Sequence, residues 1–214
     1  MRFKLILDGI RMWLKRRRLT CYGLRPAAEC DLDFIMEEIV DGAKNGHYAA
    51  SLLDPRQING LREQFERVIN SSTMVRATDR GIEKIHAELF VYCSKKDDQV
   101  GYVFVSEKYP GSINEEVELY KAGVKESHRG EGHGRRIVEL FVSCSHPSVK
   151  LYARCFQSSA IMFLLLQEFG FSHFNTMPYG TRELERCAIK SITKSHSAKS
   201  RAGRRRRIHK AGRE

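Results

Sequence analysis

The sequence predicts an α/β protein, in which helices cover both faces of a mixed β-sheet. Residues 24–69 hold a short strand pattern followed by two amphipathic helical patterns, and residues 73–106 read as three strands. From residue 117 onward the order becomes strand, helix, strand, helix, and two short strand patterns follow. Strands that alternate with helices pair in parallel, whereas strands joined by short turns pair antiparallel, so the sheet is expected to be mixed.

The first half of the domain begins with residues 24–27, which look like the end of a strand. Asp31 is placed to cap a helix, because apolar residues recur after it at helical spacing. Asp54 and Pro55 start a second helix with a capping carboxylate and a proline in the first turn. The expected buried faces of the two helices are Leu32, Ile35, Met36 and Ile39, and then Ile58, Leu61, Phe65, Val68 and Ile69.

The strands and helices of the second half follow from β-branched and apolar runs between polar turns. We expect strands at 73–78, 85–92 and 100–106, the last two joined by the polar turn 94–99. Beyond these we expect a strand at 117–124, a helix through 142, a strand at 149–155, a helix at 158–169, and closing strands at 170–174 and 182–189.

Length and composition limit the classes of protein that the chain can represent. Its 214 residues suffice for one domain with a sizeable core. The longest apolar run falls short of the about 18–20 residues that a transmembrane helix needs. The six cysteines are scattered and form no C-x-x-C pair, so no metal site is predicted. Without a secretory signal, the expected location is the cytoplasm, where thiols stay reduced.

The net charge of +11 is concentrated at the two ends of the chain. Residues 1–18 carry a net +6 and residues 194–214 a net +8, which leaves the part between them at −3. The expected organisation is therefore a basic amphipathic extension at 1–20, a domain at 21–192, and a basic tail at 193–214 that is predicted to be disordered. Basic segments of this kind concern the partners of a protein and not its fold.

A glycine-rich segment at 118–136, ELYKAGVKESHRGEGHGRR, carries the strongest functional signal. A strand pattern leads into a loop containing Gly130, Gly132 and Gly134, and a helical pattern follows at once. Such a turn presents backbone N–H groups to an anion, and glycines let the backbone approach a phosphate closely. Arg129 and Arg135 flank the turn and add positive charge. We expect this loop to bind a phosphate group.

The same segment resembles the GNAT superfamily of acyl-CoA-dependent N-acetyltransferases. Arg129-x-x-Gly132-x-Gly134 is similar to the family's Q/R-x-x-G-x-G/A motif, and the strand VELYKAGV ends five residues before Arg129. The following VKLYARCF, SSAIMFLLLQEF and Gly170-Phe171 also match the order of elements in these enzymes. The resemblance covers about residues 24–192 and implies a GNAT-like mixed, centrally splayed sheet flanked by helices, with the basic extensions outside it.

Acetyl-CoA is the co-substrate that this resemblance implies. The N–H groups of the loop would hold its pyrophosphate, two residues of the preceding strand would pair with the pantetheine arm through backbone groups, and a serine at the start of the later helix would lie near that arm. The cofactor-binding residues expected on this basis are Ala122, Val124, Arg129, Gly130, Glu131, Gly132, His133, Gly134, Arg135 and Ser158. His128 and His133 flank the loop and are expected near phosphate or solvent.

The expected catalytic residue is Glu118, as general base. Transfer to an amine requires removal of a proton from an ammonium group, and Glu118 lies six residues before Val124, as in the histone-acetylating branch of the family. The position where many members have a tyrosine acid is Leu166, which cannot donate a proton. Tyr152 and Tyr179 are substitutes without positional support. Cys155 is expected to pack in the core.

The predicted reaction is direct transfer of an acetyl group from acetyl-CoA to an amine, which would make the protein an N-acetyltransferase. The residues expected near the acceptor are Asp41, His47, Tyr48, Asp54, Tyr179 and Arg182. The candidate acceptors are a protein lysine or N-terminus, a polyamine or aminoglycoside, or an aminoacyl-tRNA, and the basic tail favours a protein or nucleic-acid-associated amine among them. The alternative is a catalytically weak binding module whose tail contacts nucleic acid or the ribosome. Residues 1–18 are a candidate for peripheral membrane contact.

Overall fold

The computed structural model describes residues 23–78, 81–94, 98–109 and 116–187. The basic ends, on which we predicted membrane and nucleic-acid contacts, lie outside this part of the chain. The strands are β1 (Gly23–Pro26), β2 (Thr73–Thr78), β3 (Gly81–Cys93), β4 (Gln99–Glu107), β5 (Glu116–Val124), β6 (Lys150–Cys155), β7 (Ser172–Thr176) and β8 (Arg182–Arg186). The helices are α2 (Leu32–Lys44), α3 (Pro55–Ser71), α4 (His133–Cys144) and α5 (Ala160–Glu168), with short 3-10 turns at Glu29–Asp31, Ala50–Leu53, Glu126–His128 and Pro178–Gly180.

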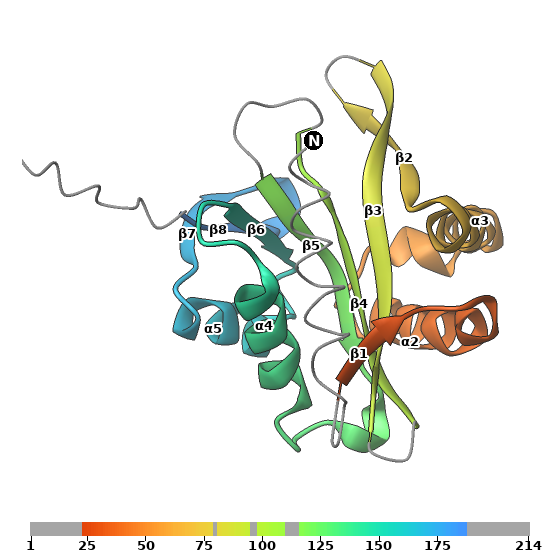
Figure 1. Ribbon diagram of the computed structural model, residues 1–214, viewed down its shortest axis with the longest axis horizontal. Helices are drawn as coiled ribbons and strands as arrows, with labels where there is room; N and C mark the ends of the chain where they lie inside the picture. Colours follow the sequence, from red (N-terminus) through yellow and green to blue (C-terminus); the bar gives the residue numbers. More distant parts are fainter. Residues whose placement is uncertain (1–22, 79–80, 95–97, 110–115, 188–214) are drawn as a thin grey trace, which may run out of the picture.

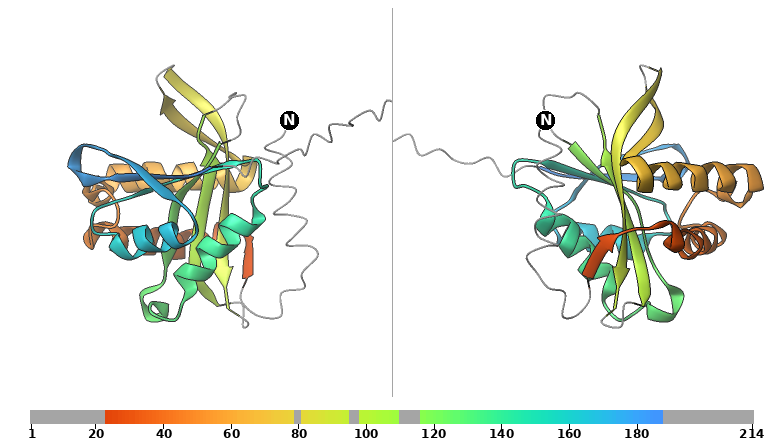
Figure 2. Two further views of the ribbon diagram at one scale, coloured as in Figure 1. Left: turned by 90° about the vertical axis from the view of Figure 1, so that its left-hand side faces the viewer. Right: turned by 45° about the vertical axis from the view of Figure 1, so that its right-hand side comes forward.

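The eight described strands form one mixed sheet, which confirms the predicted α/β class. Their order is β1-β3-β4-β5-β6-β8-β7, and β2 pairs with the part of β3 that β1 leaves open. Strands β5 and β6 pair in parallel and are connected through α4, while the other pairs are antiparallel. Helices α2 and α3 lie on one side of the sheet and α4 and α5 on the other (Figures 1 and 2).

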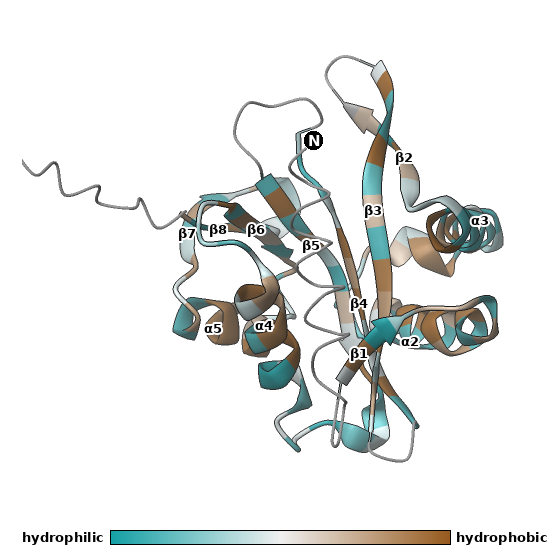
Figure 3. Ribbon diagram, in the orientation of Figure 1, coloured by the Kyte–Doolittle hydropathy of each residue, from teal (hydrophilic) through white to brown (hydrophobic). Residues whose placement is uncertain are grey.

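Each face of the sheet has its own hydrophobic core. On the α2–α3 side, Ile35 and Phe65 pack against Phe104, and all three are fully buried. On the other side, Ile137 and Leu166 pack against Leu151. The hydrophilic residues of α3 lie away from the sheet and its hydrophobic ones toward it (Figure 3). Burial of these apolar faces is the main force that holds the helices against the sheet.

The sheet opens between β5 and β6, which confirms the predicted central splay. Parallel pairing runs from Glu116–Lys150 to Leu119–Ala153 and stops there, although both strands continue. The register with β4 also shifts at this point: Phe104 opposes Lys121 and Val105 opposes Leu119, so Tyr120 is an extra residue in a β-bulge. The bulge bends β5 away from β6 just where the two strands separate.

Most predicted elements are present, with their ends shifted by a few residues. Strand β2 has the predicted bounds, whereas β3 begins four residues earlier than expected and α5 two residues later. The capping role of Asp31 was predicted wrongly. Its buried carboxylate does not cap α2 but accepts hydrogen bonds from the Ala28 N–H at 2.8 Å, from Arg25 at 2.6 Å and from Gln99 at 2.6 Å. These charged and polar donors outcompete the helix N–H groups.

Among the described residues, no helix combines the length and the apolar character that crossing a bilayer requires.

Candidate functional site

A cavity of about 740 Å³ follows the opening between β5 and β6. One end is lined by the glycine-rich loop and the start of α4, including Gly130, Gly132 and Gly134. The other end is lined by Tyr120, by Arg154 and by the segment that follows α2, and β5 forms the wall between the two ends. Nine of the ten predicted cofactor-binding residues line this cavity: Ala122, Val124, Arg129, Gly130, Gly132, His133, Gly134, Arg135 and Ser158.

The loop has the backbone geometry of an anion site. Gly130 and Gly132 have φ angles of 84°, which residues with a side chain adopt only with strain, and Gly132 is the N-cap of α4. Within the described chain, no acceptor contacts the N–H groups of Gly130, Gly132 or Gly134. N–H groups that point outward at a helix N-terminus attract an anion through their hydrogen bonds and through the helix dipole.

The open edge of β5 lies in line with this loop. Lys125 donates its N–H to the Val100 carbonyl at 2.8 Å, so Val124 and Ala122 belong to the set of residues whose N–H and C=O groups point away from β4. Their carbonyls bind side chains: Arg129 Nε donates to Val124 at 3.0 Å, and the Tyr48 hydroxyl donates to Ala122 at 2.7 Å. Beyond Leu119, β6 does not cover this edge. An extended amide chain can therefore pair here as a strand would.

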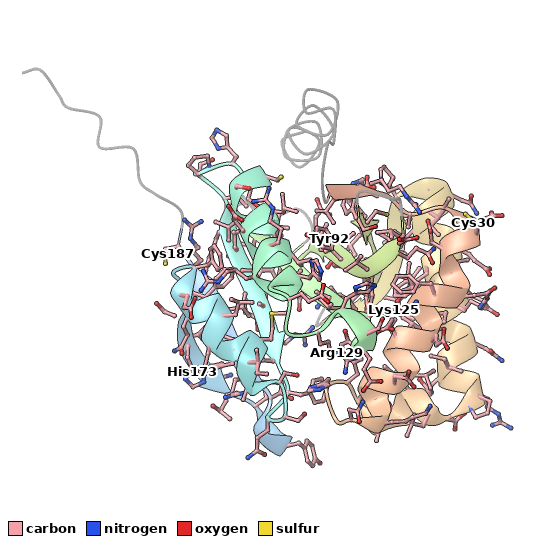
Figure 4. The ribbon with its side chains drawn as sticks, turned by 90° about the horizontal axis from the view of Figure 1, so that it is seen from below. Cys30, Tyr92, Lys125, Arg129, His173 and Cys187 are labelled. Carbon is pink, nitrogen blue, oxygen red and sulfur yellow. The ribbon has the colours of Figure 1, made fainter. Side chains whose placement is uncertain are left out.

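Arg129 joins the loop to α2. Its guanidinium lies 3.7 Å from the buried carboxylate of Glu38, and Figure 4 shows the residue between the α4 and α2 sides of the molecule. Burial raises the pKa of Glu38, and the charge of Arg129 counteracts this. Arg135, on the first turn of α4, forms an ion pair with Glu168 of α5. Both arginines thus stand at the loop end of the cavity.

The tenth predicted residue, Glu131, is outside the lining. Its carboxylate lies 3.1 Å from Nε2 of the buried His133 and 3.8 Å from Nδ1 of His128. These three side chains bring their ligand atoms within 4.8 Å of one another. This geometry could hold a cation, but it lies within the glycine-rich loop, and the predicted absence of a metal stays a prediction.

Ser158 fastens the start of α5 to the segment after α2. Its hydroxyl donates to the Gly46 carbonyl, and the neighbouring Ser159 hydroxyl lies 3.3 Å from His47 Nδ1. Gly46 has a φ of 73°, and a Cβ there would lie 3.2 Å from the Ser158 hydroxyl oxygen. Ser158 thus lines the cavity while it holds the segment after α2 against the start of α5.

Glu118, the predicted base, is buried and bound to two arginines. Its Oε2 accepts from Arg76 of β2 at 2.6 Å, and its Oε1 accepts from Arg154 of β6 at 2.9 Å. The residue does not line the cavity, although Arg154 does. A carboxylate in this position fixes the two guanidinium groups, and it reaches the cavity only through them or through a water molecule.

Sequence reasoning did not find the residues that line the cavity at the end of the splay. Tyr120 and Lys121 both face the α2–α3 side, because the bulge interrupts the alternation of side chains. The Lys121 ammonium lies 4.7 Å from the Tyr48 ring centroid and 5.6 Å from that of Tyr120. Burial, and then the charge of Arg154, lower the pKa of Lys121 to about 8, although the charge of Glu118 opposes this shift. A bulge leaves no mark in the sequence that would have revealed this pairing.

The structure provides no tyrosine at the position of Leu166, which is fully buried in the core. Tyr152 donates its hydroxyl to Glu183, and Tyr179 is completely exposed, so neither substitute faces the cavity. Tyr48 does line it. Burial raises the pKa of Tyr48 to about 12, and its hydroxyl is within 2.6 Å of that of Tyr102.

The residues predicted around the acceptor divide into two groups. His47 and Tyr48 line the cavity. Asp41 pairs with Lys44 at 2.9 Å on the surface, Asp54 caps α3 by accepting from the Arg56 N–H at 2.7 Å, and Arg182 donates to the Phe156 and Gln157 carbonyls. The last three therefore support the frame and do not line the site.

We compared the sequence and the structure with those of known proteins. No protein-family model and no curated protein matches the sequence. The structure is similar to a GCN5-related N-acetyltransferase from Kribbella flavida, with 16% identity, 78% of this chain and 97% of that chain covered, and a TM-score of 0.57.

Two further similar structures were solved with ligands. One is a GNAT superfamily phosphinothricin acetyltransferase from Sinorhizobium meliloti in complex with AcCoA, with 17% identity, 78% and 88% of the two chains covered, and a TM-score of 0.56. The other is a spermidine N-acetyltransferase from Vibrio cholerae in complex with CoA and spermine, with 14% identity, 78% and 95% covered, and a TM-score of 0.53. With its splayed mixed sheet, its open β5 edge and its glycine-rich loop at a helix N-terminus, this chain has the fold of the GNAT acetyltransferases.

Proposed function

We propose that the protein is an acetyl-CoA-dependent N-acetyltransferase. One observation carries the proposal: the glycine-rich loop, whose glycine N–H groups contact no described acceptor, and the open edge at Ala122 and Val124 lie along one cavity that extends to the splay. Pyrophosphate at the loop and an amide-containing pantetheine arm along β5 would place a thioester between β5 and β6. The cavity volume of about 740 Å³ is within the range of small-molecule sites, about 300–1,000 Å³.

The reaction is a direct displacement at the thioester. The lone pair of the acceptor nitrogen forms a bond to the carbonyl carbon, the carbon–sulfur bond breaks, and coenzyme A leaves as a thiolate. The nitrogen loses one proton in the process, and the thiolate later gains one. The chain contributes chiefly by holding the two reactants in line, which replaces a bimolecular encounter with a positioned one.

Glu118 remains our candidate for the group that accepts the proton. The structure sets a condition on that role, because both carboxylate oxygens bind guanidinium groups and the residue lies behind Arg154. The proton would travel through a water molecule between the cavity and the Glu118 carboxylate. If this path does not exist, Glu118 is a positioning residue for Arg154.

The leaving group needs no tyrosine acid. A thiol has an ordinary pKa of about 8.5, so a thiolate is stable enough to depart near neutral pH. Tyr48, whose pKa burial raises to about 12, is a weaker acid than the thiol that it would protonate. The absence of a hydroxyl at Leu166 is therefore compatible with turnover.

Calorimetric titration of acetyl-CoA and of coenzyme A into the protein tests the cofactor site. We expect both to bind with micromolar dissociation constants. A transfer assay that follows release of the coenzyme A thiol then tests the reaction with a panel of amines. Failure to bind at millimolar ligand would contradict the proposal, whereas binding without transfer to any amine would leave only the binding-module alternative.

The net charge of +8 on residues 194–214 favours a second role for the tail, which lies outside the described residues. We propose that it attracts nucleic-acid phosphates, as clusters of arginine residues do. This role is independent of the cavity and of the acceptor that the cavity takes: it would hold an active enzyme near nucleic acid, or it would be the main activity of a catalytically weak domain.

A further inference from the structure

The acceptor end of the cavity carries an excess of positive charge. Three cationic groups surround the ring of Tyr120: Arg76 at 5.2 Å, Lys121 at 5.6 Å and Arg154 at 5.9 Å from its centroid. One carboxylate, that of Glu118, pairs with both arginines. No described carboxylate pairs with Lys121. Three like charges around one half-buried ring with one counter-charge destabilise the empty site, so a ligand charge is the natural complement.

The acidic groups near the cavity do not balance this excess. Within the described chain, Glu38 is the one carboxylate in the lining, and it lies at the loop end beside Arg129. Glu183 binds the Tyr152 hydroxyl and the Asn175 amide, 2.7 Å away, outside the lining. A polycation at the splay would therefore meet Lys121 and Arg154 without a carboxylate to pair with it.

The cofactor does not account for these cations either. On the proposed function, the phosphates of acetyl-CoA bind at the loop, where Arg129 and Arg135 stand. The pantetheine arm and the thioester that reach the splay are uncharged. Lys121 and Arg154 are thus left for the acceptor.

We propose that the acceptor is a small amine that also carries an oxyanion, a carboxylate or a phosphonate-type group, and that Lys121 and Arg154 bind this oxyanion. This inference rests on the proposed function and names the substrate class of the same site. Arg154 suits the role because Glu118 holds its Nε and Nη2, at 2.9 and 2.8 Å, so that the guanidinium edge bearing Nη1 is presented in a fixed direction. Lys121 suits it because its ammonium rests on two aromatic rings and not on a carboxylate.

The bound oxyanion would place the amine beside the thioester. Lys121 and Ala122 are adjacent in β5, and the Ala122 N–H faces the splay where the arm of the cofactor would pair. A charge-assisted contact to Lys121 therefore anchors the acceptor within one residue of the proposed thioester position.

The test uses the transfer assay with acetyl-CoA and makes two comparisons. L-Methionine and L-methioninamide differ only in the carboxylate, and phosphinothricin, which carries oxyanions, is set against spermidine, a polycation without one. We expect kcat/KM to be roughly 10- to 100-fold higher for the oxyanion-bearing member of each comparison, because the other member cannot form the charge-assisted hydrogen bond. Equal or better transfer to methioninamide and spermidine would overturn the inference while leaving the proposed function intact.

Variants identify the residue responsible. Lys121→Met should remove most of the preference through a higher KM, Lys121→Arg should retain it, and Lys84→Met, an exposed lysine of β3, should leave it unchanged. If no amine is acetylated, calorimetry of the same four amines with the protein, with and without coenzyme A, decides the matter. If the protein binds the oxyanion-bearing amines selectively and Lys121→Met abolishes this binding, the anion site is supported although the proposed function has failed. Binding without selectivity, or no binding at all, would reject the anion site.

Discussion

Nε and Nη2 of Arg154 lie 2.9 and 2.8 Å from Oε1 of Glu118, and this ion pair joins β6 to β5 at the point where their pairing ends. It fastens the two strands below the opening and fixes the guanidinium at the edge of the cavity. The other oxygen of the same carboxylate binds Arg76 of β2. One carboxylate therefore links β2, β5 and β6 and also fixes the guanidinium that lines the cavity.

Replacing Glu118 with Gln tests the two roles that this position can have. If Glu118 accepts the proton, turnover with an amine should fall by roughly 10²–10⁴-fold while the affinity for acetyl-CoA is unchanged. Because two guanidinium groups lose their counter-charge, the free energy of unfolding should also fall, by about 1–3 kcal/mol. Chemical denaturation and steady-state kinetics measure the two effects separately.

The pH profile distinguishes the outcomes for this variant. If Glu118 is the base, kcat/KM of the variant should no longer fall at low pH. If Glu118 only holds Arg154 in place, the variant should have a higher KM for the acceptor, and kcat/KM should still fall at low pH. A decrease in turnover of less than a few-fold would remove Glu118 from the catalytic group.

Replacing Gly134 with Val should block the cofactor and spare the fold. Gly134 lines the cavity, and a Cβ there would have only Leu165 within 4 Å, at 3.9 Å, so the protein has room for the larger side chain. The side chain would stand where the phosphate must approach. If the phosphate then loses two charge-assisted hydrogen bonds to N–H groups of the loop, acetyl-CoA should bind about 100-fold more weakly or worse. Calorimetry measures this loss of affinity.

Gly60→Val is the matched control for this substitution. Gly60 is an exposed residue of α3, and a Cβ there would meet nothing within 4 Å. Both variants should unfold within about 1 kcal/mol of the wild type, because valine and glycine differ little in helix propensity. Equal cofactor affinity in the two variants would contradict the assignment of the loop.

Replacing Lys121 with Met should stabilise the protein while weakening its site. Burial, and then the charge of Arg154, lower the pKa of Lys121 to about 8 from 10.5, so the charged lysine is disfavoured in the folded state. Below pH 8 the folded protein bears this cost, and the variant should gain about 1–2 kcal/mol in unfolding free energy.

The pH dependence of this gain follows from the two pKa values. Between about pH 8 and 10.5 the unfolded chain keeps the Lys121 proton that the folded chain has lost, so the wild type gains stability with rising pH and the advantage of the variant shrinks. Lys108, whose pKa burial also lowers to about 8, is common to both proteins and cancels. Thermal denaturation at pH 7 and pH 10 measures the difference. A variant that is less stable than the wild type at pH 7 would disagree with this account.

Replacing Tyr48 with Phe should cost stability more than catalysis. The hydroxyl binds both the Ala122 carbonyl and the Tyr102 hydroxyl, and its loss leaves the buried Tyr102 hydroxyl without this partner, at about 1–2 kcal/mol. Because Tyr48 is too weak an acid to protonate the thiolate, we expect kcat to fall by less than about tenfold. A larger loss of kcat, with the Tm little changed, would identify Tyr48 as the acid.

Shortening the chain to end at Thr193 tests the tail. Binding of single- and double-stranded nucleic acid, measured by fluorescence anisotropy at several salt concentrations, should weaken in the shortened protein. The slope of log affinity against log salt should fall by about 0.7–0.9 for each phosphate that the protein no longer neutralises. Acetyl-CoA affinity, which depends on the cavity, serves as the internal control. Equal nucleic-acid binding by both proteins would place the binding surface elsewhere.

The order of the helices and strands and the position of the glycine-rich loop can be read from the sequence alone. Periodicity located the helices through Ile35 and Phe65, and the glycines at 130, 132 and 134 marked the loop. These signals are local: a helix face repeats every 3.6 residues, and a phosphate loop needs glycines at neighbouring positions of the chain. Residues close in sequence are sufficient to specify them.

The arrangement of side chains where β5 and β6 separate depends instead on tertiary packing. Strict alternation along β5 would have placed Tyr120 and Lys121 on opposite faces, and the bulge puts both on the α2–α3 side. Arg76, Glu118 and Arg154 come from three strands, and their ion pairs depend on register and on the point at which β5 and β6 separate. The net charge of a site is the sum over side chains that packing brings together. Spacing in the sequence does not reveal which charged side chains will be neighbours.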